Sequence, residues 1–257
     1  MDVSIGHAII LAAGMGARLG SLMDGRPKGL IEIDAESLVG RSVRLLRDAG
    51  IEHITIVTGY GAEYFQRFAA GQPDIRLVHN DKFASTGSMA SLAVALDGVQ
   101  HGVVVLESDI VYEARALTAI LNAAAPDSTV VSGPTYAGDE VWVYAPEGRL
   151  EAMSKTAHEL PGVSGEFVGI TRLSASAATA MIHAFNRLVD ANGHGGFDYE
   201  TDALVAVARL YPVAALLIRD LCWGEIDDER QYDRVVNHVW PAVGNQLPRG
   251  GGLSRTP

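Results

Sequence analysis

The sequence is poor in cysteine and has no long hydrophobic run. A single cysteine among the 257 residues, Cys222, excludes an intrachain disulfide. The cysteine and histidine positions also lack zinc-finger spacing. Nowhere do about 18 uncharged apolar residues follow one another, which excludes an ordinary transmembrane helix. The first residues lack the basic start of a secretory leader, so we expect a cytoplasmic protein that does not bind membranes.

Positive charge is scarce as well. Lysine and arginine number 20 against 31 aspartates and glutamates, and the formal net charge is −11. Such a surface repels nucleic-acid phosphates and anionic lipids, so neither is an expected partner. The lysines are Lys28, Lys82 and Lys155, few enough to consider one by one. With 48% hydrophobic residues, the chain has the composition of a folded globular protein.

Short apolar segments alternate with amphipathic ones through the first half of the chain. The strands are expected at 7–13, 53–60, 75–79 and 102–108, and the helices at 37–49, 61–70, 88–97 and 114–124. This alternation predicts an α/β fold with a Rossmann-like, doubly wound, mostly parallel sheet. Beyond residue 128 the rhythm changes and predicts an added antiparallel portion that binds the acceptor. Its expected elements are strands at 129–133, 140–145, 166–172 and 213–218 and helices at 174–191 and 199–211.

The domain organisation follows from the absence of internal repeats and of interdomain linkers. Residues 1–243 are therefore expected to form one domain. Residues 244–257, which read GNQLPRGGGLSRTP, have too little apolar surface to fold alone, and we expect a disordered tail there.

A glycine-rich loop follows the first expected strand. Residues 11–20 read LAAGMGARLG, and Pro27 and Lys28 come shortly after them. Backbone amides at glycines can approach a polyphosphate closely, and Arg18 and Lys28 supply positive charge. The glycines of the loop do not have the spacing of a dinucleotide-binding loop. The loop is not a Walker loop either, because Lys28 is preceded by proline and followed by glycine.

The pattern L-A-A-G-x-G-x-R, followed after eight intervening residues by P-K, resembles the signature of nucleotidyltransferases that couple a nucleoside triphosphate to a sugar phosphate or a phosphoalcohol. The resemblance extends over roughly 7–240. It is closest to the cytidylyltransferases that act on phosphocholine and on phosphonates such as 2-aminoethylphosphonate. It implies a nucleotidyltransferase A fold, magnesium as the cofactor, and CTP and a small phosphoryl or phosphonyl acceptor as the substrates.

The resemblance also implies roles for residues around the nucleotide. The expected nucleotide-binding residues are Leu11, Ala12, Ala13, Gly14, Gly16, Asn80, Lys82, Gly87 and Ser88. For Lys82 a solvated position on a loop is an equal alternative. Arg18 and Lys28 are expected at the departing pyrophosphate, and Lys155 at the phosphoryl groups being joined.

The metal ligands are expected to be carboxylates. Asp109 follows a buried strand at its carboxyl end, where open α/β sheets bind ligands. It either caps the next helix or holds a metal, and the phosphate loop favours the metal. Within the segment WGEID at 223–227, the resemblance favours Asp227 as the second ligand and Glu225 as an alternative or supporting one. Asp228 is expected to cap a helix that begins near 229.

The acceptor site is expected in the second half of the chain, with Glu166, Asp198 and Tyr199 as its candidate residues. A carboxylate suits a primary amine, an aromatic cage suits a quaternary ammonium, and a basic side chain suits a carboxylated phosphonate. The sequence offers all three, although its aromatic residues are by default packing residues.

The expected reaction is in-line attack by an acceptor oxygen on the α-phosphorus of CTP, with release of pyrophosphate. A phosphomonoester, with a second pKa of about 6, is already ionised at pH 7, so no general base is needed. The alternatives are a sugar-1-phosphate nucleotidyltransferase that uses UTP or dTTP and a non-catalytic, nucleotide-binding regulatory relative. A homodimer is a further expectation.

Overall fold

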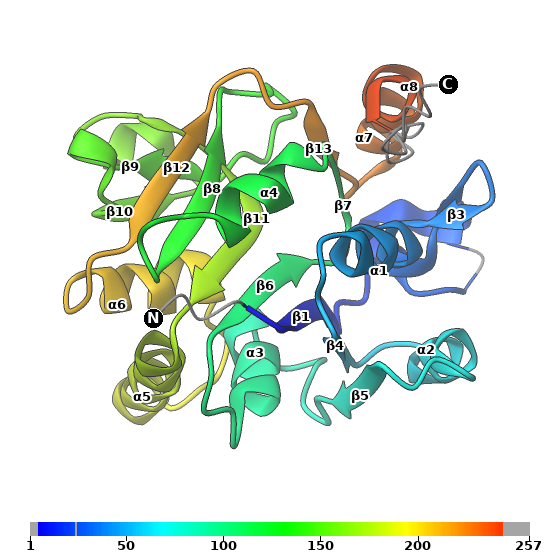
Figure 1. The fold of residues 1–257 in the computed structure, drawn as a ribbon, viewed down its shortest axis with the longest axis horizontal. Coiled ribbons are helices and arrows are strands. Elements are labelled where there is room, and N and C mark those ends of the chain that lie inside the picture. Colours follow the sequence, from blue (N-terminus) through cyan, green and yellow to red (C-terminus); the bar gives the residue numbers. More distant parts are fainter. Residues whose placement is uncertain (1–4, 24, 244–257) are drawn as a thin grey trace, which may run out of the picture.

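The computed structural model describes residues 5–23 and 25–243 (Figure 1). The tail at 244–257, for which we expect disorder, lies outside the described residues. None of the helices in the described part of the chain combines the length and apolar character that a membrane-spanning helix requires.

A nine-stranded sheet forms the centre of the molecule, with the strand order β10-β9-β11-β6-β1-β4-β5 and with β8 and β12 branching from β11. Four of its strands come from the first half of the chain: β1 (His7–Ala12), β4 (His53–Thr58), β5 (Ile75–His79) and β6 (Val103–Glu107). Neighbours among these four pair in parallel. This is the arrangement that alternating strands and helices predict, because a crossover must return the chain to the same end of the sheet.

The strands of the second half add the antiparallel portion. They are β8 (Ser128–Ser132), β9 (Trp142–Tyr144), β10 (Ala152–Ser154), β11 (Gly165–Leu173) and β12 (Ala214–Ile218). β11 runs antiparallel to β6, β8 and β9, whereas β12 is parallel to β8. The predicted class, an α/β fold with a large, mostly parallel sheet, is confirmed.

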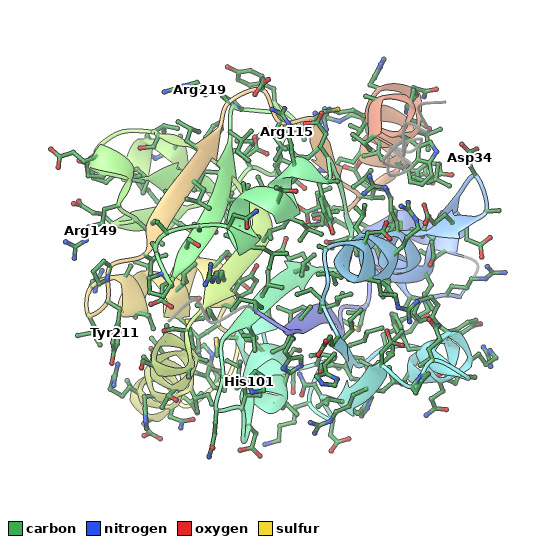
Figure 2. The ribbon with its side chains drawn as sticks, viewed as in Figure 1. Asp34, His101, Arg115, Arg149, Tyr211 and Arg219 are labelled. Atoms are coloured by element: carbon green, nitrogen blue, oxygen red, sulfur yellow. The ribbon has the colours of Figure 1, made fainter. Side chains whose placement is uncertain are left out.

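Helices cover both faces of the sheet. α1 (Leu38–Asp48), α2 (Ala62–Ala69) and α4 (Arg115–Leu121) bury apolar side chains on one face, and α1 and α4 lie in front of the strands in Figure 1. α3 (Ser88–Leu96), α5 (Ala175–Asn192) and α6 (Val205–Ala208) pack on the other face. Ser37 and Ser174 cap α1 and α5 by accepting the amide hydrogen of the third helical residue. The exposed side chains of Arg115, Arg149 and Arg219 lie at the margin of the molecule (Figure 2).

The structure departs from the expected elements where segments are short. The strands β2 (Glu32–Ile33), β3 (Glu36–Ser37) and β7 (Ile110–Tyr112) were not expected, because two or three residues carry no readable periodicity. A strand was expected at Glu225 and Asp227, and the structure has β13 at Trp223–Glu225. The expected loop at 14–28 contains 3₁₀ turns at Ala17–Met23 and from Lys28 to Leu30. The expected helix at 199–211 is a wider, π-type turn, Tyr199–Leu204, followed by the short α6.

The end of the described chain returns to the glycine-rich loop. It forms α7 (Glu229–Arg234), a wider helical turn (Val235–Val239) and α8 (Trp240–Val243). Asp228 caps α7, as expected, in a capping box with Gln231. Leu19 from the loop is fully buried in one apolar cluster with Val111 and Val235. This cluster holds the loop beside β7 and the C-terminal helices.

One buried histidine at the opposite end of the parallel strands links stability to pH. The Nδ1 atom of His7 lies 3.0 Å from Nε2 of His101, and its Nε2 atom lies 2.9 Å from Oγ1 of Thr55. Burial, reinforced by His101, lowers the pKa of His7 from 6.5 to about 4. Between pH 6.5 and about 4, His7 therefore binds a proton in the unfolded chain but stays neutral in the folded protein. The stabilisation is complete above pH 6.5 and is lost as the pH falls towards about 4.

We expect His7→Gln to flatten this dependence. Between pH 7 and pH 5 the wild-type free energy of unfolding should fall by roughly 2 kcal/mol more than that of His7→Gln, measured by urea denaturation. The exposed His183→Gln is the matched control. An equal pH dependence in wild type and His7→Gln would contradict this assignment.

Candidate active site

A cavity of about 390 Å³ lies at the carboxyl ends of β1 and β6. The carboxyl ends of parallel strands are where open α/β sheets bind ligands, because the loops there diverge. Fifteen of the residues expected in the site line this cavity: Leu11, Ala12, Ala13, Gly14, Gly16, Arg18, Lys28, Gly87, Ser88, Asp109, Lys155, Asp198, Tyr199, Glu225 and Asp227. The structure thus brings the glycine-rich loop together with segments up to about 200 residues away in the chain.

The start of α3 is joined to residues 195–199 by hydrogen bonds. The Gly87 amide donates to the Gly195 carbonyl at 2.9 Å, and the Tyr199 amide donates to the Ser88 hydroxyl at 2.9 Å. A Cβ at position 87 would collide with the backbone of Phe197, so this close approach requires glycine. The contact places Asp198 and Tyr199 in the wall of the cavity.

Two residues expected at the nucleotide, Asn80 and Lys82, do not line this cavity. Asn80 is 3% exposed, and its side-chain amide donates to the hydroxyl groups of Ser91 at 3.0 Å and Thr86 at 3.3 Å. Ser91 and Thr86 themselves line the cavity, so Asn80 supports the wall from behind. Lys82 lies exposed on the loop after β5, which agrees with the solvated alternative.

Lys28 forms ion pairs with both expected metal ligands. Its ammonium contacts Asp109 Oδ2 and Asp227 Oδ1, and Arg18 adds a 2.7 Å ion pair to Asp227. Burial alone would lower the pKa of Lys28, but the charges of Asp109 and Asp227 outweigh burial and raise it above its usual value. Burial likewise favours the neutral form of Asp227, and the two cations reverse this effect and lower its pKa. Lys28 and Asp227 are therefore both charged at neutral pH.

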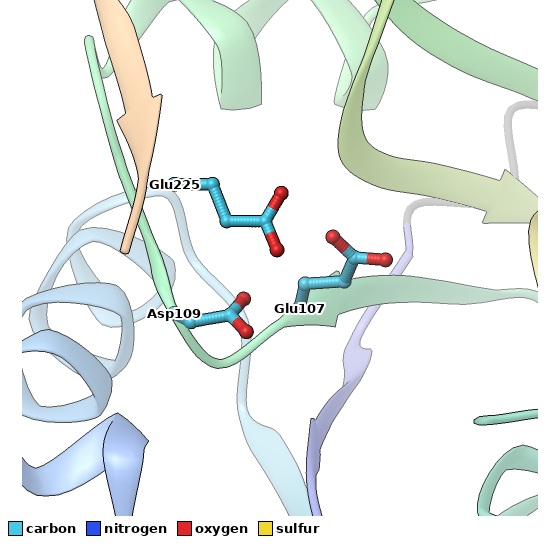
Figure 3. A group of neighbouring side chains, drawn as sticks. All are labelled: Glu107, Asp109 and Glu225. Atoms are coloured by element: carbon cyan, nitrogen blue, oxygen red, sulfur yellow. The ribbon is translucent and has the colours of Figure 1, made fainter. Parts of the chain in front are cut away.

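Two groups of carboxylates meet beside Lys28. Oxygens of Glu107, Asp109 and Glu225 lie within 4.8 Å of one another, as do oxygens of Asp139, Glu225 and Asp227. Figure 3 shows the first group: Glu107 at the end of β6, Asp109 on the loop after it, and Glu225 on β13 all point into one space. Burial, and then the neighbouring negative charges, raise the pKa values of Glu107 and Glu225 well above the usual range.

This donor set fits a hard divalent cation. Magnesium and calcium prefer carboxylate oxygens, and all the acidic groups here are aspartates and glutamates. The Oδ1 atom of Asp109 is buried without a hydrogen-bond partner, which leaves one ligand atom unused. Asp109, Asp227 and Glu225 are the residues that would hold the ion, and Glu107 lies in the same group of carboxylates.

A second cavity of about 440 Å³ adjoins the first. The two cavities share the side chains of Arg18, Glu107, Lys155, Glu200, Glu225 and Asp227. The second is further lined by Thr135, Asp139, Glu140, Glu166 and Phe167, among others. Of the expected acceptor residues, Glu166 faces this second cavity, whereas Asp198 and Tyr199 face the first.

Lys155 lies in the wall between the two cavities. Its ammonium forms a 2.6 Å ion pair with Asp198. Burial would lower the pKa of Lys155, but this carboxylate outweighs burial and raises it. Asp198 thus orients Lys155, which lines both cavities.

The acceptor-side carboxylates are unusually buried. Glu166 is 3% exposed and accepts hydrogen bonds from the Thr135 amide at 2.5 Å and the Thr135 hydroxyl at 2.9 Å. Burial raises its pKa to about 7, although the Thr135 hydrogen bonds oppose this shift. Burial, and next the charge of Asp198, raise the pKa of Glu200 to about 7. Both groups titrate near neutral pH.

Sequence reasoning missed Glu107, Asp139 and Glu200. Glu107 is the last residue of a buried apolar strand, and a carboxylate at that position could have identified it as a candidate site residue. Glu200 lies on the unexpected π-type turn, so no helix face predicted where it points. Asp139 lies on an irregular loop that offers no periodicity.

The ion pairs of Lys28 suggest a stability test. We expect Lys28→Met to lower the free energy of unfolding by about 3 kcal/mol, because the largely buried Asp109 loses its counter-charge and Asp227 keeps only Arg18. Millimolar magnesium should then raise the melting temperature of Lys28→Met more than that of the wild type, because the cation no longer competes with an ammonium group. Thermal unfolding with and without magnesium measures both effects.

Lys82→Met is the matched control, because Lys82 is exposed and lines neither cavity. Its stability and magnesium response should match the wild type. Equal magnesium shifts in Lys28→Met and the wild type would contradict cation binding at these carboxylates.

The chain is similar to several proteins of known activity. It is 27% identical over 246 residues to CMP-5'-(3-aminopropyl)phosphonate synthase of Streptomyces rubellomurinus, which covers 88% of this chain and 38% of that relative. It is 24% identical over 242 residues to CTP:phosphoglutamine cytidylyltransferase of Campylobacter jejuni, covering 86% of this chain and 95% of the relative. The chain thus spans less than half the length of the Streptomyces relative.

The fold is shared with solved structures. CTP:phosphocholine cytidylyltransferase of Streptococcus pneumoniae superposes with a TM-score of 0.75 at 22% identity, over 90% of this chain and 98% of the other. The family model of the MobA-like NTP transferase domain matches residues 8–184, which contain the glycine-rich loop, Asp109 and Lys155. The chain therefore belongs to the family of MobA-like NTP transferase domains.

Proposed function

We propose that the protein transfers a cytidylyl group from CTP to a small phosphonate or phosphoalcohol and releases pyrophosphate, with magnesium as its cofactor. The observation that carries this proposal is the pair of adjoining cavities with a shared wall of carboxylates and cations. A reaction between two phosphoryl compounds needs two such sites that meet at the reacting atoms. The names of the relatives from Streptomyces and Campylobacter support cytidylyl transfer.

The first cavity suits the triphosphate. Its glycine-rich loop offers backbone amides, and Arg18 and Lys28 carry the positive charge that the pyrophosphate group requires as it leaves. When bound, magnesium neutralises phosphate charge and makes the α-phosphorus more electrophilic. Asp109 and Asp227 would hold the ion, which would leave the Lys28 ammonium free to contact phosphate oxygens. The pairing of Lys28 with these carboxylates is thus the resting arrangement.

Lys155 suits the reacting centre, because it lies in the wall shared by the two cavities. An ammonium there attracts the acceptor oxyanion and stabilises the negative charge that builds up on the α-phosphoryl group. The acceptor oxyanion is already ionised at neutral pH, so alignment and charge stabilisation suffice.

The second cavity suits an acceptor with a cationic group. Asp139, Glu140 and Glu166 lie along it, away from the shared wall. Among the described residues that line it, the aromatic ones are Phe167 and Trp223, and the indole nitrogen of Trp223 donates to Ser132 at 2.8 Å. Carboxylates thus dominate over an aromatic cage, which favours a primary amine such as that of an aminoalkylphosphonate.

A nucleotide and acceptor screen tests the proposed reaction. Pyrophosphate release should require CTP and an acceptor, with 2-aminoethylphosphonate and phosphocholine as the first probes, and UTP or dTTP should be poor substitutes. Asp109→Asn and Asp227→Asn should each lower the rate by about 10²–10³ while circular dichroism shows a folded protein. Preference for UTP with a sugar 1-phosphate, or normal rates in both variants, would refute the proposal.

Glu166 provides a test of the acceptor class. Ionised Glu166 attracts an ammonium group, and the pKa of about 7 means that this attraction strengthens as the pH rises from 6 to 8. We expect Glu166→Gln to raise the KM for 2-aminoethylphosphonate about tenfold at pH 8 and to weaken the pH dependence of that KM. Ethylphosphonate, which lacks the amine, is the control substrate, and its KM should respond little. A similar rise for both phosphonates would exclude an amine contact at Glu166.

A further inference from the structure

The loop between β8 and β9, residues 133–141, forms one wall of the second cavity. Thr135, Asp139 and Val141 line the cavity from this loop. Its two ends are tied to β11: Thr135 is held by Glu166, and the Val141 carbonyl accepts the Phe167 amide at 2.9 Å. The middle of the loop has different partners, and these come from the far end of the described chain.

Gln231, in the first turn of α7, contacts the loop and the metal-ligand segment at the same time. Its side-chain Nε2 donates to Asp139 Oδ2 on the loop. Its Oε1 accepts the backbone amide of Asp227 at 2.6 Å and that of Asp228 at 3.2 Å. The side chain is 3% exposed, so these bonds form away from competing water.

The neighbouring Arg230 adds a second contact from the same turn, because its guanidinium donates to the Ala137 carbonyl. The loop is thus held in its middle by two adjacent residues of α7. A capping box alone requires no donor at Gln231, since a glutamate serves equally well there. The Gln231 side chain therefore uses its oxygen for the helix cap, and its NH₂ group is available to bind the loop.

We propose that Gln231 is a positioning residue that holds the loop at 133–141 at a fixed distance from Asp227. The inference rests on the proposed function, because it assigns the second cavity to the acceptor. A glutamine both donates and accepts, so one side chain fixes the distance between the wall of the acceptor cavity and the carboxylate beside the phosphates. Loss of the loop contact should weaken acceptor binding and leave CTP binding intact.

Gln231→Glu separates this role from helix capping. Glutamate keeps the capping box and can still accept the amides of Asp227 and Asp228, but it cannot donate to Asp139 and repels it. We expect the acceptor KM to rise about tenfold while the KM for CTP stays within twofold. Gln66→Glu on the exposed face of α2 is the same chemical change far from the site and should alter neither value.

The double variant Gln231→Glu/Asp139→Asn reverses the direction of the hydrogen bond. The amide of the introduced asparagine would donate to the carboxylate of the introduced glutamate, so the hydrogen–deuterium exchange of residues 133–141 should recover most of the way from the single variant towards wild type. Exchange is the readout for this double variant, because Asp139 itself lines the acceptor cavity. Arg230→Met changes an exposed residue and removes the second contact with the loop. It should also raise the acceptor KM without raising the KM for CTP. No recovery in the double variant, or parallel rises of both KM values, would overturn the proposal.

Hydrogen–deuterium exchange of residues 133–141 is a readout that needs no catalysis. Exchange should be at least several-fold faster in Gln231→Glu than in the wild type and unchanged in Gln66→Glu. If the wild type transferred no cytidylyl group, the proposed function would fail, yet the exchange experiment would still report on the loop contact. Equal exchange in Gln231→Glu and the wild type would show that Gln231 does not hold the loop.

Discussion

The site depends on the contact of one ammonium group with two carboxylates. Lys28 joins the glycine-rich loop to Asp109, after β6, and to Asp227, after β13. The packing around it leaves little freedom: a Cβ at Gly29 would lie 2.8 Å from Val39, and one at Gly61 would lie 2.7 Å from Pro27. Three distant parts of the chain are thereby held at one end of the sheet, where ligands of parallel α/β proteins bind.

Under the proposed function, this contact would also explain how a strongly acidic protein accepts polyanionic substrates. The net charge of −11 disfavours phosphates at long range. Within the cavity, however, Arg18, Lys28 and Lys155 are gathered from a chain that has few lysines. The carboxylates that these cations face are suited to a divalent cation, and with such a cation bound part of the acidic excess would serve the binding of phosphate.

Much of this arrangement could be predicted from the sequence. The parallel strands β1, β4, β5 and β6 were predictable because short strand-like segments alternate with helical ones along this part of the chain. The glycine-rich loop and Asp109 were predictable because they follow such strands. A capping signal at Asp228 likewise identified the start of α7.

The remainder depends on contacts that no local pattern encodes. Asn80 was expected at the nucleotide, but an asparagine at a strand end can bond a ligand or its own neighbours, and here it bonds Ser91. The hydrogen bond between Asp139 and Gln231 joins residues 92 positions apart. The ion pair of Asp198 with Lys155 joins residues 43 positions apart, and no local pattern predicts it.

The central claim is that Lys28 exchanges its carboxylate partners for phosphate when the substrate and the cation bind. A crystal structure with CTP and magnesium tests this claim most directly. The account predicts an ion bound by oxygens of Asp109 and Asp227, with the Lys28 ammonium in contact with the triphosphate. A nucleotide bound elsewhere, or Lys28 still bridging both carboxylates beside a bound triphosphate, would contradict it.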